Sequence, residues 1–157
     1  MLVPGDPRFD EMLELAHVAT SSTLNELQRS RWRSLCAGML GALQSAGMVS
    51  ERRRAVRGTA SLQVSVLSPE PLSGTAVTSS VSAGGLALRS TAAARIGQPI
   101  ELSITVPERR EAVVVEGEVV WSRPGEIGLQ LPRLPEVERE LLEAVAVKAI
   151  LVYAALD

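Results

Sequence analysis

Residues 100–131 have the sequence IELSITVPERREAVVVEGEVVWSRPGEIGLQL, and this stretch indicates an all-β core. Ile100, Leu102 and Ile104 alternate with polar residues, which is the two-residue period of a half-buried strand. Segments 107–111 and 124–125 are rich in the proline, glycine and charged residues typical of turns. The stretch therefore predicts strands at 100–106, 112–122 and 127–131.

The same composition extends upstream to Arg57, with valine, threonine and serine punctuated by glycine and proline. It predicts three more strands, at 60–67, 75–81 and 86–90. Six short strands with regular breaks and no helix between them favour a mainly β fold, a small six-stranded antiparallel β-barrel.

Helical patterns flank the predicted barrel. Residues 6–17 carry a rough apolar stripe, which the polar run 19–22 is expected to end. Thr23 is the predicted N-cap of a second helix, with Glu26 completing a capping box, and Gly47 is the predicted C-terminal stop. These features divide the chain into an N-terminal helical segment, 1–50, and a barrel domain, 51–157.

A third helix is expected at the C-terminus, from 134 or 135 to 156. Its second half, from Ala144, contains one charged side chain, Lys148, and is apolar nearly all round. Such a helix must be buried on more than one side, and a small barrel can cover only one. The other cover is either the N-terminal helix or a second subunit, and we expect a homodimer or higher oligomer through this helix.

Composition excludes several classes of protein. The 157 residues carry 16 basic and 18 acidic side chains, a net charge of -2, and only 3% aromatics. A protein that coats nucleic acid needs a broad basic field or stacking platforms, so nucleic acid is not an expected partner. No basic-then-apolar leader and no 18-residue apolar stretch occur, so we expect a cytoplasmic protein without a membrane span.

Catalysis is not expected. His17 is the only histidine and lies on the first helix, without an obvious partner for acid–base chemistry. Cys36 is the only cysteine and falls on an apolar helix face, where a buried thiol is the ordinary interpretation. No residues stand at metal-ligand spacing, and no glycine-rich phosphate loop precedes a helix. We predict neither a catalytic site, nor a metal, nor a cofactor.

The segment ERRRAVRG, residues 51–58, is the strongest candidate for binding. It is either a solvated basic linker or an anion clamp, because guanidinium groups bind phosphate through paired hydrogen bonds. The spacing of Arg53 and Arg57 is weak by itself, since 15 of the 16 basic residues are arginine. Arg29 and Arg33 have the same spacing in a predicted helix, with no evident purpose.

A second segment, TSSVSAGGL at 78–86, joins small hydroxyl residues to paired glycines between two strands. It is either a plain hairpin turn or a place where a ligand can approach the backbone closely.

Together these segments resemble the PilZ domain, the bacterial receptor module for cyclic di-GMP. That family carries two arginines separated by three residues, then a strand, then Asp or Asn, any residue, Ser, two residues and Gly. Arg53, Arg57, Ser82 and Gly85 match this order, and 116–122 with 127–131 resemble the closing strands of that barrel. The resemblance implies a cyclic di-GMP site made by the residues Arg53, Arg57, Ser80, Ser82 and Gly85, with Arg52 and Arg54 able to add phosphate contacts.

The resemblance also implies a mechanism. Ligand would draw the arginine segment onto the barrel and so reposition the preceding helix, and the output would be contact with an unknown protein effector. Ser80 departs from the family, which has Asp or Asn there to hold a guanine edge. We expect weakened binding, and the alternative is a degenerate PilZ-like interaction adaptor or oligomerisation module that does not bind cyclic di-GMP.

Overall fold

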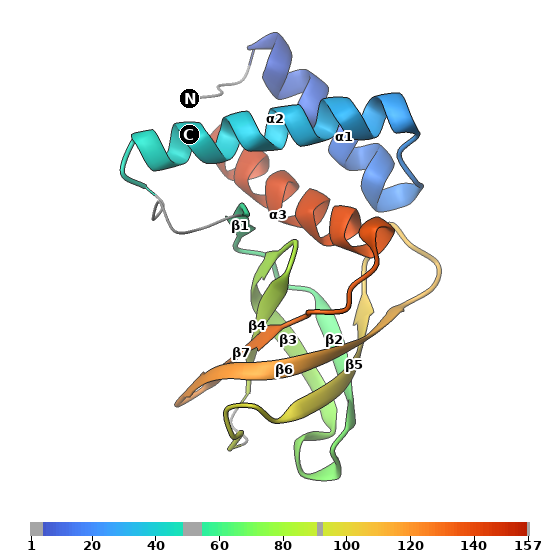
Figure 1. Ribbon diagram of the computed structural model, residues 1–157, viewed down its shortest axis with the longest axis vertical. Helices are drawn as coiled ribbons and strands as arrows, with labels where there is room; N and C mark the ends of the chain where they lie inside the picture. Colours follow the sequence, from blue (N-terminus) through green and yellow to red (C-terminus); the bar gives the residue numbers. More distant parts are fainter. Residues whose placement is uncertain (1–4, 49–54, 91–92, 157) are drawn as a thin grey trace.

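The computed structural model describes residues 5–48, 55–90 and 93–156. Figure 1 shows the α-helices gathered at one end of a β-barrel. In chain order the elements are α1 (Pro7–Ser21), α2 (Glu26–Ser45), β1 (Arg57–Gly58), β2 (Gln63–Ser68), a short 3-10 helix η1 (Glu70–Leu72), β3 (Gly74–Ser82), β4 (Gly85–Arg89), β5 (Pro99–Thr105), β6 (Val113–Arg123), β7 (Glu126–Gln130) and α3 (Glu136–Leu156).

The barrel is closed and antiparallel, which confirms the predicted fold class. Its strands follow the order β3-β2-β5-β6-β7-β4, and pairing between β3 and β4 closes the circle. Each of the six strands lies within a few residues of its predicted position. The two-residue strand β1, which the sequence analysis did not predict, pairs with the end of β3 outside the barrel.

Alternation of side chains builds the barrel core, as the sequence pattern predicts. Along β5, Ile100, Leu102 and Ile104 are each no more than 1% exposed, while the residues between them are partly exposed. Val64 on β2 and Val119 on β6 complete the interior from neighbouring strands. Apolar side chains with a two-residue period therefore fill the barrel.

Helix α3 lies between two apolar cores. Leu141 and Leu142 belong to the barrel core, whereas Ala144, Val147 and Leu151 pack with residues of α1 and α2. Figure 1 shows α3 crossing the end of the barrel with α1 and α2 on its far side. The sequence left open whether the N-terminal helix or a second subunit buries the side of α3 that faces away from the barrel. In this structure α1 and α2 of the same chain bury Ala144, Val147 and Leu151.

The ends of α1 and α2 differ in part from the prediction. The run 19–22 does not end α1 at residue 17, because the buried Thr20 hydroxyl donates to the Ala16 carbonyl (3.0 Å) and the helix continues to Ser21. The N-cap of α2 is Asn25, not Thr23. Its Oδ1 accepts from the Gln28 amide (2.8 Å), and the Gln28 Oε1 accepts from the Asn25 amide (2.9 Å).

The capping box therefore forms two residues later than predicted, because Leu24 is buried and the helix starts only after it. At the other end the prediction is confirmed. Gly47 follows the last helical turn with φ +74°, a left-handed conformation that favours glycine. The Met48 amide donates to the Leu43 carbonyl (3.0 Å), which satisfies an end carbonyl of α2.

Candidate functional site

Three neighbouring strands bring the predicted site residues together. In the register of the sheet Arg57 on β1 is opposite Ser82 on β3, and Ser82 is in turn opposite Gly85 on β4. The turn between β3 and β4 lies at the end of the barrel that faces α3 (Figure 1). Residues 25 or more positions apart in the chain, such as Arg57 and Ser82, thus become direct neighbours.

A β-bulge in β3 decides which hydroxyls reach the site. The pairing passes from Thr78–Leu88 to Ser80–Ala87, so Ser79 is the extra residue. Thr78 is fully buried, and its hydroxyl accepts from the Leu62 amide (2.8 Å) and donates to the Ala60 carbonyl (2.5 Å).

Beyond the bulge, Val81 points into the barrel core, and Ser80 and Ser82 share the opposite face. The Ser82 hydroxyl donates to the Gly85 carbonyl (3.2 Å) and so holds the hairpin turn.

A cavity of about 310 Å³ lies over this face. Arg57, Ser80, Ser82 and Gly85 all line it, together with Trp121 and other residues of β6 and β7. The structure therefore gathers four of the seven predicted site residues around one hollow. The other three, Arg52, Arg53 and Arg54, lie outside the described residues.

A second cavity of about 460 Å³ adjoins the first. The two share Arg57, Ser82, Gly84 and Gln130 in their linings, so they form adjacent lobes of one concave surface. The second lobe extends to Arg139 on α3. A helix that packs on the barrel core therefore also borders the candidate site.

Two glycines allow the backbone and an aromatic ring to approach closely here. A Cβ on Gly85 would lie 2.5 Å from the Leu129 carbonyl oxygen on β7. A Cβ on Gly128 would lie 2.1 Å from ring atoms of Trp121, so that ring packs directly on the β7 backbone. The guanidinium carbon of Arg123 is 4.7 Å from the centre of the same ring, a cation–π contact.

The charge of the site favours anions. Among the described residues, the charged side chains lining the two cavities are Arg57 and Arg139, and no carboxylate lines either one. Glu126 on β7 is engaged by Ser79 and by Arg123. Those hydrogen bonds, the one from Ser79 foremost, lower the pKa of the Glu126 carboxyl. In a chain with a net charge of -2, this hollow is locally cationic.

The sequence analysis did not assign Trp121, Gln130 or Arg139 to the site. Trp121 offered a signal, because it stands in a segment that resembles a closing strand of the family. Arg139 offered none, since it is one charged residue in a helix start rich in charge. Only the packing of α3 across the barrel brings it to the cavity.

The residues considered for catalysis lie elsewhere. Cys36 is 7% exposed on α2, and burial raises the pKa of its thiol. It fits the interpretation as a buried apolar residue. None of the helices in the described segments combines the length and apolar character needed to cross a membrane.

The comparisons with known proteins agree with this geometry. The PilZ domain family model matches residues 51–147, more than half of the chain. The chain therefore belongs to the PilZ domain family, a family of cyclic di-GMP receptor and adaptor modules that are generally binding modules and not enzymes. No curated protein matches the chain.

Two solved structures have the same fold. The inhibitor of motility MotI (DgrA) of Bacillus subtilis has a TM-score of 0.55 and 21% identity, over 65% of this chain and 52% of MotI. The PilZ domain of YcgR from Escherichia coli, solved with c-di-GMP, has a TM-score of 0.50 and 10% identity, over 64% of this chain and 92% of that domain. This chain thus matches only about half the length of MotI.

Proposed function

We propose that this protein is a cyclic di-GMP receptor that converts ligand binding into a change of helix or partner contacts. One observation carries the proposal: Arg57, Ser80, Ser82 and Gly85 line a single cavity with arginine and no carboxylate among its described charged residues. A dinucleotide with two phosphates is an anion with planar bases, and such a site offers it charge, hydroxyls and accessible backbone.

Each residue has a part in this proposal. Arg53 and Arg57 bind phosphate, with Arg52 and Arg54 as additional donors, and each charge-assisted hydrogen bond contributes about 1.5–3 kcal/mol. Ser80 and Ser82 offer hydroxyls toward a guanine edge. Gly85 lets the ligand reach the backbone of the hairpin.

Ser80 sets the affinity in this proposal. Serine carries one hydroxyl, whereas Asp or Asn can make two hydrogen bonds with a base edge. The missing contact weakens binding by about 1–3 kcal/mol, or about 10- to 100-fold.

Strand β1 is the proposed link between ligand and helices. Gly58 is the residue directly after Arg57. A Cβ on Gly58 would lie 2.3 Å from the Ala146 carbonyl oxygen, so the backbone of β1 packs directly on the backbone of α3. Residues 46–56 connect α2 to β1 in the chain. Ligand that fixes β1 therefore acts on the contacts of α2 and α3. It can shift the arrangement of these helices only as far as its affinity differs between the two arrangements.

The output in this proposal is contact with an unknown protein effector in the cytoplasm, without catalysis or cofactor. Residues 1–50 form the helical output segment, and 51–157 form the receptor domain. Self-association through the C-terminal part of α3 belongs to the same proposal, and its support is Val152, an apolar side chain that is exposed in the second, mostly apolar half of α3.

A titration of the purified protein with cyclic di-GMP, followed by calorimetry, tests the proposal. We expect the unmodified chain to bind, and Arg53→Ala and Arg57→Ala each to abolish binding. Arg110→Ala is the matched control, because Arg110 is exposed on the loop between β5 and β6 and lines neither lobe. Unchanged affinity in both site variants would refute the site.

A second candidate function is an adaptor that no longer binds cyclic di-GMP, and Ser80 is the observation that favours it. In that case the barrel serves as a scaffold for the helices. The calorimetric titration with cyclic di-GMP distinguishes the two functions. The absence of a binding heat at tens of micromolar protein would favour the adaptor over the receptor.

A further inference from the structure

Arg139 belongs to no motif discussed above, yet it lines the second lobe of the cationic hollow. It stands in the first turns of α3, and its side chain is exposed. Arg57 lines the same lobe from β1. Two guanidinium groups from elements far apart in the chain therefore border one cavity of about 460 Å³.

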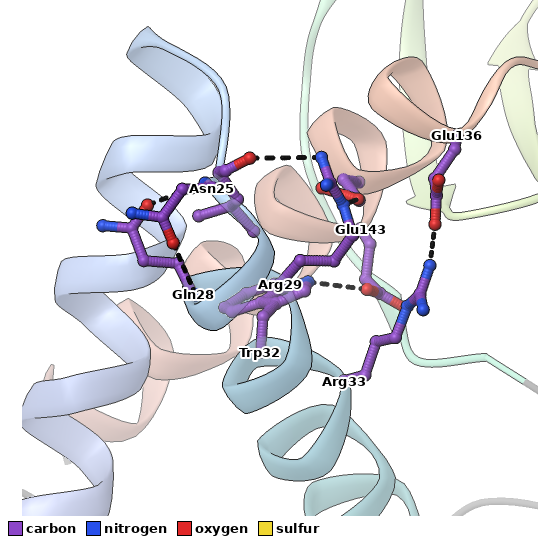
Figure 2. Close-up of polar contacts among 9 residues, drawn as sticks. Asn25, Gln28, Arg29, Trp32, Arg33, Glu136 and Glu143 are labelled. Carbon is purple, nitrogen blue, oxygen red and sulfur yellow. Dashed lines mark hydrogen bonds and ion pairs between the residues drawn. The ribbon is translucent and has the colours of Figure 1, made fainter.

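Three carboxylates of α3 near Arg139 contact side chains of α2. Glu136 pairs with Arg33, Glu140 pairs with Arg29, and Glu143 accepts a hydrogen bond from the Trp32 indole (2.7 Å). Figure 2 shows Arg33 directed toward Glu136 and Trp32 directed toward Glu143. Within the described segments Arg139 forms no ion pair, and its charge acts on the Glu143 carboxyl only at longer range, so the exposed guanidinium can bind an anion.

We propose that Arg139 is an anion-binding residue of the same site, and that a phosphate of the bound dinucleotide lies between it and Arg57. This inference rests on the proposed function. A ligand held by both residues would connect β1 directly to α3. A phosphodiester has two non-bridging oxygens, so one phosphate can accept hydrogen bonds from both guanidinium groups at once.

This contact also gives ligand binding a direct route to the helices. Arg139 is adjacent in sequence to Glu140, which pairs with Arg29 of α2 and is 7% exposed. Ligand that binds Arg139 therefore acts on the same helical turn that holds α2. Coupling of this kind requires that the ligand stabilise one arrangement of α3 over another.

Cyclic di-GMP titrations of four chains test the inference: the unmodified protein, Arg57→Ala, Arg139→Ala and Arg133→Ala. We expect Arg139→Ala to weaken binding by about tenfold or more, since one charge-assisted contact is lost. Arg139→Lys should retain part of the affinity. Arg133→Ala is the matched control, because Arg133 is close in sequence and exposed but lines a different cavity.

A second readout concerns α3 itself. In the unmodified protein, ligand should slow amide hydrogen exchange in the first turns of α3, and in Arg139→Ala at saturating ligand it should not. If Arg57→Ala abolishes binding while Arg139→Ala binds as tightly as Arg133→Ala, the role of Arg139 is refuted and the receptor function stands. If the unmodified chain does not bind, both proposals fail together.

Discussion

Arg29 and Arg33 have the same spacing as Arg53 and Arg57, but they join α2 to α3. Arg29 and Arg33, for which the sequence suggested no purpose, pair with Glu140 and Glu136, which are themselves four residues apart on α3. Figure 2 shows the Arg33–Glu136 pair between the two helices, with Arg29 on the same helix as Arg33. Glu140 lies 111 positions after Arg29 in the chain, so spacing alone could not reveal the pair. Arg57, by contrast, lines the candidate site.

Ser80 provides a test at the scale of one residue. Its backbone lies opposite Ala87, and it lines the cavity beside Arg57. Ser80→Asn or Ser80→Asp should tighten cyclic di-GMP binding by about 10- to 100-fold, because either side chain adds a second hydrogen-bonding atom for a base edge. Calorimetric titration measures the change.

Ser65→Asn is the control for this substitution. Ser65 is exposed on β2 and lines neither lobe of the hollow, so its replacement should leave the affinity unchanged. Equal or weaker binding by both Ser80 variants would show that the departure from the family pattern does not limit affinity.

At the scale of elements, α2 is held on α3 by two ion pairs that differ in burial. The side chains of Arg29 and Glu140 are 19% and 9% exposed, whereas those of Arg33 and Glu136 are 63% and 55% exposed. A carboxylate that loses its partner in a buried place keeps its desolvation penalty, but an exposed one is solvated by water.

Arg29→Ala should therefore lower the free energy of unfolding more than Arg33→Ala does, because it leaves the buried Glu140 carboxylate without its partner. Arg33→Ala, in the same interface and with the same change of charge, should lower it by less than about 1 kcal/mol. Urea denaturation followed by circular dichroism gives both values. Similar losses in the two variants would mean that burial does not distinguish these pairs.

The barrel could be predicted from sequence because its determinants are local. Alternating residues such as Ile100, Leu102 and Ile104 specify both strand and inward face within a few positions. The sequence pattern placed the N-cap of α2 at Thr23, two residues before the observed N-cap, Asn25. Both residue types are good N-caps, and the burial of Leu24 decides between them.

The candidate site could be predicted only in part, for a similar reason. The arginine and serine–glycine segments carry motifs, and their convergence follows from the order of the strands. Arg139 reaches the cavity through the packing of a helix on the barrel, and the two-residue strand β1 forms only by pairing with β3. Neither the position of Arg139 nor the formation of β1 is encoded in a local sequence pattern, since each depends on contacts between residues far apart in the sequence.

At the scale of the whole molecule, the remaining question is how α3 is covered. Ala144, Val147 and Leu151 are already buried within one chain by α1 and α2, which removes part of the apolar surface that suggested an oligomer. Val152 remains 52% exposed, and Leu27 and Met48 of the α2 region are 82% and 63% exposed. Self-association through α3 would therefore use its C-terminal part around Val152.

Sedimentation velocity over a wide range of protein concentration tests this prediction. If α3 mediates a dimer, the sedimentation coefficient should rise with concentration, and Val152→Asp should abolish the rise because a charge would be buried without a partner. Val114→Asp is the control, since Val114 is an equally apolar and exposed valine that lies on β6 and not on α3. A protein that stays monomeric at the highest concentration would show that α1 and α2 suffice to cover α3, and that any output of the receptor passes through a different protein.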